Sequence, residues 1–178
     1  MAFLVRKLNK RDTLCSLSEA DNVEDILADL PTSEFRTTRG TLSTWLINSL
    51  DELNNAVLAI AVSSSNITKM DFIVIDTALL DNNGLEYKQT YAGREIPIPD
   101  LQDTHFDIIE ISLKKLENCS KVYKTIFLQE DSEVEKFIVR FTESQIMDLL
   151  KDAIENNRVD DTKATGKIKE AIKKLQVA

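Results

Sequence analysis

The sequence predicts an α/β or α+β fold in which a small mixed sheet is covered by helices and the C-terminal third is mainly helical. Residues 41–76 read as strand, helix and strand, and the segment from residue 142 onward carries apolar residues at the helical spacing of three and four. The 178 residues, 43% hydrophobic and 29% charged, are typical of one globular domain. We therefore expect a single domain over 1–178, with a helical pair at 142–178 that packs on it or extends from it.

The N-terminal part is predicted to supply one strand and one short helix. Residues 3–8 alternate loosely between apolar and polar side chains, as half-buried strands do. Residues 21–30 begin with acidic and amide side chains that suit a helix start, and Pro31 prevents the helix from continuing.

The stretch 41–76 is expected to form a βαβ unit around which the rest is organised. Residues 41–47 are rich in β-branched and aromatic side chains, and residues 70–75 form the short continuous apolar run of a strand buried on both faces. The crossover of about two dozen residues is long enough to bring the two strands parallel.

Two capping boxes mark predicted helix starts. Ser49 with Glu52 precedes an apolar stripe that ends near Val62, and Thr142 with Gln145 precedes a second one. In each box the hydroxyl accepts from a backbone amide three residues on, and the longer side chain reaches back to the first amide. A last helix is expected from about residue 163 to 175.

The middle of the chain is less regular. Residues 85–91 alternate like a strand, and the loop 92–100, with a glycine and two prolines, is where we would place a recognition loop. From Asp103 the apolar spacing predicts a helix of six or seven turns. Residues 122–141 fit either the end of that helix or a hairpin, and the sequence does not decide between them.

Composition favours an interaction protein over an enzyme. The chain has four glycines and contains no glycine-rich phosphate loop, nucleophile elbow, Cys-x-x-Cys or zinc-protease motif. Its net charge of −8 would repel phosphate, so we do not expect nucleic acid as a partner. We expect a non-enzymatic accessory or regulatory subunit of a bacterial multi-protein assembly, of the immunity, antitoxin or phage-defence kind. It would need no cofactor and would bind a protein partner or its own copies.

The expected compartment is the cytoplasm. The longest uninterrupted apolar stretch, 56–62, is far shorter than the roughly 20 residues of a membrane helix. Cys15 and Cys119 are two cysteines far apart in sequence, which suits reduced thiols better than a disulfide framework.

Two features are candidates for partner binding. The last predicted helix carries five lysines against one glutamate, and these would form a cationic docking surface if they do more than favour the helix dipole: Lys163, Lys167, Lys169, Lys173 and Lys174. Trp45 is the only tryptophan and could anchor a partner at a sheet edge, the alternative being burial under the helix that follows.

An enzymatic alternative rests on Asp76, Glu86 and Lys88. An aspartate at the end of a buried strand followed by Glu-x-Lys on another strand resembles the arrangement of metal-dependent nucleases. The resemblance implies two carboxylates that hold Mg²⁺ and a lysine that positions water. The proline that precedes the aspartate in that family is missing here.

A second metal alternative is the run containing Asp103, His105 and Asp107. In an extended segment all three side chains could face one ion. On the helix predicted here the aspartates share a face and His105 points away, so the carboxylates would instead cap the helix.

Overall fold

The computed structural model describes residues 2–9, 17, 20–22, 25–26, 33–64, 67–128 and 137–177. Within them the strands form one six-stranded sheet in the order β4-β5-β2-β1-β3-β6, in which every neighbouring pair is antiparallel. The strands are β1 (Phe3–Leu8), β2 (Leu42–Ile47), β3 (Met70–Asp76), β4 (Tyr87–Gln89), β5 (His105–Ile108) and β6 (Ile138–Phe141). The mixed α/β class is confirmed.

The two strands of the predicted βαβ unit run parallel to each other, as expected, but they do not pair. β2 and β3 are both antiparallel to β1, so they run parallel to each other, and α3 (Leu53–Ser63) connects them. β1 lies between them, with Leu4 opposite Leu46 on one side and Ile75 on the other. The expected direct parallel pairing is therefore wrong, because the apolar N-terminal strand is buried on both faces and takes the central position.

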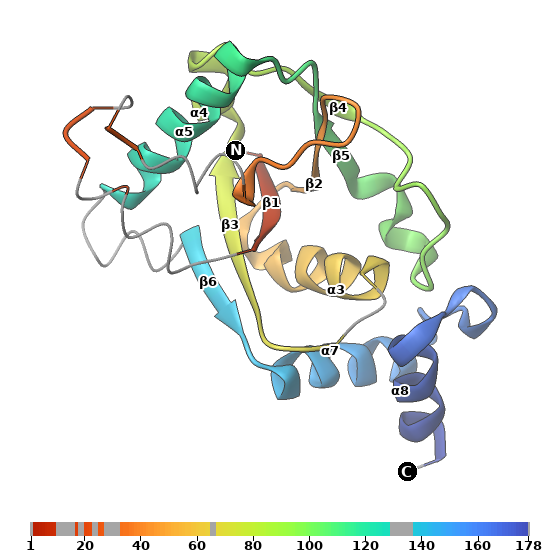
Figure 1. The fold of residues 1–178 in the computed structure, drawn as a ribbon. Coiled ribbons are helices and arrows are strands. Elements are labelled where there is room, and N and C mark those ends of the chain that lie inside the picture. The colour runs from red at the N-terminus through yellow and green to blue at the C-terminus, as the bar shows by residue number, and fades with distance from the viewer. Residues whose placement is uncertain are drawn as a thin grey trace.

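Helices cover both faces of the sheet (Figure 1). Phe3 and Val5 point into a cluster formed with α3, α7 (Glu143–Glu155) and α8 (Gly166–Val177). Leu4 and Leu8 point to the opposite cluster, which includes residues of α4 (Thr77–Asn82) and α5 (Leu113–Phe127). The alternation along β1 thus divides the apolar core into two layers, and α8 shares one of them with α3.

One predicted capping box is confirmed and the other is wrong. Thr142 Oγ1 accepts from the Gln145 amide at 3.2 Å, and Gln145 Oε1 accepts from the Thr142 amide at 2.8 Å. At the other helix, Ser49 makes no capping bond with any described residue, and Glu52 Oε2 instead accepts from the Asn48 amide at 2.8 Å. The short 3-10 helix η3 (Leu50–Glu52) leads into α3 there.

The helix expected from Asp103 begins ten residues later. The chain forms the 3-10 helix η4 (Pro99–Thr104), then β5, and only then α5, whose first turn is capped by Ser112. Between β5 and α5, Glu110 has a positive φ of 55°. This left-handed conformation ends the strand and separates it from the helix that follows. β5 is a strand because β2 and β4 hydrogen-bond to it on both sides.

Of the two alternatives for residues 122–141, helix or hairpin, the structure shows a helix for residues 122–127. α5 continues through Phe127, and β6 pairs with β3 rather than with residues 122–129. The last helix, α8, begins three residues later than predicted, after the 3-10 helix η5 (Asp161–Lys163). The predicted helix at 21–30 lies largely outside the described residues. None of the described helices is long and apolar enough to cross a membrane.

Candidate functional site

A buried polar network joins β4 and β5 at one end of the sheet. Thr90, just after β4, donates its hydroxyl to Asp107 Oδ2 at 2.9 Å, and His105 Nδ1 lies 3.0 Å from the same hydroxyl oxygen. His105 is 5% exposed and Asp107 9%. Asp107 Oδ1 is buried and has no hydrogen-bond partner among the described residues.

The hydrogen bonds determine which ring nitrogen of His105 carries the proton. Nδ1 lies 3.3 Å from the Thr90 carbonyl oxygen, which can only accept, and the single Thr90 hydroxyl proton already goes to Asp107. Nδ1 is therefore the donor, and a neutral His105 presents Nε2 as its acceptor. The network holds the ring in one orientation.

Trp45 packs against this histidine and is not available to a partner. Its ring meets the His105 ring edge to face, with centroids 5.0 Å apart and planes at 78°, and the residue is 3% exposed. The prediction that Trp45 anchors a partner is wrong, because β2 is an inner strand with β1 and β5 on either side.

The metal alternative at residues 103–107 is not assembled. Asp103 is exposed in η4, where its backbone oxygen accepts from Gln89 Nε2, while His105 and Asp107 point into the network from β5. In the described part of the chain, no three His, Cys, Asp or Glu side chains come together as a possible metal site. The physical reason is the boundary between η4 and β5, which separates Asp103 from the other two residues.

The nuclease-like set is also separated. Asp76 ends β3 and Lys88 lies in β4, with β1, β2 and β5 between them. Four strand spacings of about 4.8 Å place them roughly 19 Å apart, too far for a shared Mg²⁺. Glu86 is exposed and forms an ion pair with Lys115 of α5 at 3.7 Å.

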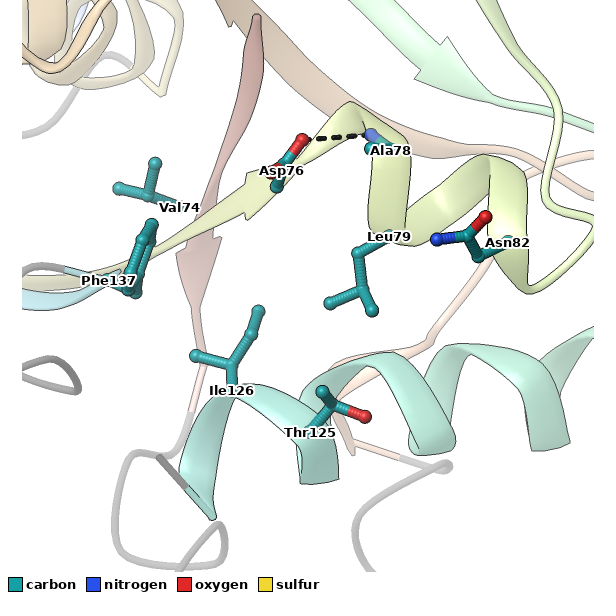
Figure 2. Close-up of a pocket in the computed structure, with 8 residues that line it drawn as sticks. All are labelled: Val74, Asp76, Ala78, Leu79, Asn82, Thr125, Ile126 and Phe137. Atoms are coloured by element: carbon teal, nitrogen blue, oxygen red, sulfur yellow. Dashed lines mark hydrogen bonds between the residues drawn. The ribbon is translucent and has the colours of Figure 1, made fainter. Parts of the chain in front are cut away.

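Asp76 borders a small pocket between β3, α4 and α5 (Figure 2). The pocket measures about 220 Å³ and is lined by Val74, Asp76, Ala78, Leu79, Asn82, Thr125, Ile126 and Phe137. Figure 2 shows the Asp76 carboxylate turned toward the start of α4, where it accepts from the Ala78 amide at 2.9 Å. The carboxylate therefore caps a helix, and the side chains around the pocket are mostly apolar.

Lys163 is engaged within the chain. Its ammonium lies 3.2 Å from Glu95 and 3.6 Å from Asp160, and the hydrogen bond with Glu95 is the main cause that raises its pKa. Lys163 therefore connects η5 to the 92–100 loop, and the prediction that it belongs to a free docking surface is wrong.

The other four predicted lysines are exposed on α8. Ile168, Ala171 and Ile172 turn inward to the core, and none of the four lysines forms an ion pair with another described residue: Lys167, Lys169, Lys173 and Lys174. Lys169 and Lys173 are one turn apart on one flank of the helix. Lys167 and Lys174 are two turns apart on the other flank.

Lys167 and Lys174 border a groove of about 240 Å³ between α7 and α8. Ile67, Met147 and Ala171 supply apolar lining, and Glu143 and Glu170 also line it. Figure 1 places the two helices next to each other at the end of the chain. The excess of lysines over glutamates on the last helix identified these residues from the sequence, but the groove was missed, because Ile67 comes from a distant part of the chain.

Comparisons with protein-family models, with curated proteins and with solved structures found no match.

Proposed function

We propose that this protein is a non-enzymatic interaction module, an accessory or regulatory subunit of a bacterial multi-protein assembly, which binds a partner protein through the surface of α8. The observation that carries the proposal is the groove between α7 and α8, which combines an apolar lining with two lysines. Such a site fits an acidic partner segment that also presents an apolar side chain.

The spacing of the groove's lysines supports a short acidic segment as the partner. Lys167 and Lys174 are separated by about 10 Å along the helix axis, so two carboxylates at the ends of a short segment could pair with both. Met147, which also lines the groove, has an unbranched side chain that adapts to varied apolar partners. Glu143 and Glu170 favour a partner with its own basic residue beside the carboxylates.

Charge supports a protein partner over nucleic acid. The chain carries a net charge of −8, so the four free lysines of α8 form a local exception on an acidic molecule. Long-range repulsion would oppose a phosphate backbone, whereas an acidic peptide segment needs only local contacts.

The test is affinity purification of the tagged protein from its native host, followed by mass spectrometry. We expect a stoichiometric partner that is lost when Lys167→Glu and Lys174→Glu are combined. The matched control combines Lys169→Glu and Lys173→Glu on the other flank of α8, which gives the same change in net charge on exposed lysines that do not line the groove. A partner retained equally by both double variants would contradict the proposed surface.

A further inference from the structure

The outer edge of β4 has unpaired backbone groups. The Ile109 amide donates to the Glu86 carbonyl at 2.9 Å, and the Thr90 amide donates to the His105 carbonyl at 3.1 Å. Lys88 opposes Asp107 midway between these bonds. In an antiparallel ladder every second residue bonds to the neighbouring strand, so Glu86, Lys88 and Thr90 bond inward to β5.

Tyr87 and Gln89 must then direct their amide and carbonyl groups away from β5. β4 is the first strand in the sheet order, and the backbone groups of these two residues find no partner among the described residues. An edge of this kind accepts an added strand. A hollow of about 660 Å³ lies beside it, lined by residues that include Asp81, Leu85 and Tyr87.

The side chains of this edge are complementary to a second copy of themselves. In a two-fold antiparallel pair centred on Tyr87, the two Tyr87 residues lie opposite each other. Glu86 of each copy then lies opposite Lys88 of the other copy, so the pair contains two such contacts between opposite charges. Glu86 and Lys88 lie on the same face of the strand and both are exposed. Opposite charges directly across a strand pair stabilise it, and two facing aromatic rings do the same.

The alternative centres are less favourable. A pair centred on Lys88 would place two lysines directly opposite each other, which is destabilising. A lone lysine on an edge strand discourages pairing, but Glu86 two residues earlier supplies the opposite charge that a second copy needs. Of these two centres, the charges of Glu86 and Lys88 therefore favour Tyr87.

We propose that the protein forms a two-fold symmetric dimer in which the β4 strands of two copies pair antiparallel about Tyr87. Each contact then occurs twice, as a two-fold interface requires. A strand pair of about five residues is smaller than a standard interface, so the dimer is weak and depends on protein concentration. This interface uses none of the α8 lysines, so it stands or falls independently of the proposed function.

The test is sedimentation velocity over a range of concentrations on four proteins: the natural chain, Glu86→Lys, Lys88→Glu, and the double exchange Glu86→Lys with Lys88→Glu. The natural chain should self-associate. Each single variant places like charges opposite each other at both ends, and its self-association should weaken about tenfold or more. The double exchange, and an equal mixture of the two single variants, restore opposite charges and should restore the dimer.

The design separates the interface from folding. Glu86→Lys and the double exchange both lose the ion pair with Lys115, so damage from that loss alone would persist in the double exchange. Circular dichroism confirms that each variant is folded. A natural chain that remains monomeric at every concentration would overturn the proposal. Single variants that dimerise as well as the natural chain would also overturn it. A mixture of the natural chain with Lys88→Glu that associates more tightly than either protein alone would do the same, because it would indicate a pair centred on residue 88.

Discussion

The Thr90 hydroxyl donates to the Asp107 carboxylate across 2.9 Å, although 17 residues separate them in sequence. This bond closes the end of the pairing between β4 and β5, and the His105 ring lies against the same hydroxyl. β4 has three residues, so few backbone hydrogen bonds hold it in the sheet. The buried side-chain network therefore contributes to fixing the edge strand through which we propose that two copies pair.

Replacing Thr90 with valine should destabilise the protein by about 1–3 kcal/mol, because the change leaves the buried Asp107 carboxylate and the His105 Nδ1–H with one partner fewer. Valine has nearly the same shape and a high strand propensity, so the backbone should be unaffected. The free energy of unfolding is measured by urea denaturation. Thr125→Val on α5 is the matched control: its exposed hydroxyl donates to the Lys121 carbonyl, and the change should alter the free energy of unfolding by less than about 0.5 kcal/mol. Equal effects of the two changes would show that the network contributes nothing.

The two capping boxes provide a second comparison. Thr142→Ala removes a hydroxyl that accepts from the Gln145 amide, and the expected cost is about 1 kcal/mol. Ser49→Ala removes a hydroxyl that makes no capping bond in the described structure, and we expect it to lower the free energy of unfolding by only a few tenths of about 1 kcal/mol. Chemical denaturation of the two variants measures both values. If Ser49→Ala cost as much as Thr142→Ala, the difference between the two helix starts would be contradicted.

Local patterns predicted the elements whose signals are continuous in sequence. Three of these signals each lie within one element: the capping box of Thr142 and Gln145 at α7, the apolar stripe of α3 and the apolar run of β3. The sequence alone was therefore sufficient to predict these elements. β5 was missed because four residues are too few to distinguish a strand period from a helix period. Its pairing with β2 and β4 decides its conformation.

Long-range relationships account for the remaining differences. The position of β1 between β2 and β3 depends on which strands exclude water best when packed together, and no local motif encodes that order. Lys163 was grouped with the free lysines of α8, but its ion pair with Glu95 spans 68 positions and depends on the folded loop. The candidate sites therefore changed more than the fold class did.

The last prediction concerns the buried thiol of Cys119 and has a definite pH window. Burial in α5 raises its pKa to about 12, whereas an exposed thiol in the unfolded chain has a pKa near 8.5. Below about pH 8.5 both states keep the proton, and the thiol adds no pH dependence. Between about pH 9 and 12 the unfolded state ionises while the folded state does not, so the free energy of unfolding should fall by about 1.4 kcal/mol per pH unit.

Urea unfolding at pH 9.0, 9.75 and 10.5 tests this, with Cys15→Ser as the background so that the other thiol does not titrate. The reference protein should lose stability more steeply with pH than the variant that also carries Cys119→Ala, by about 1.4 kcal/mol per pH unit. Burial raises the pKa of Tyr123, and Cys119 also contributes to that rise, so both proteins additionally carry Tyr123→Phe to remove this second titration from the comparison. Equal slopes in the two proteins would contradict the prediction, because they would mean that the Cys119 thiol ionises as readily in the folded protein as in the unfolded chain.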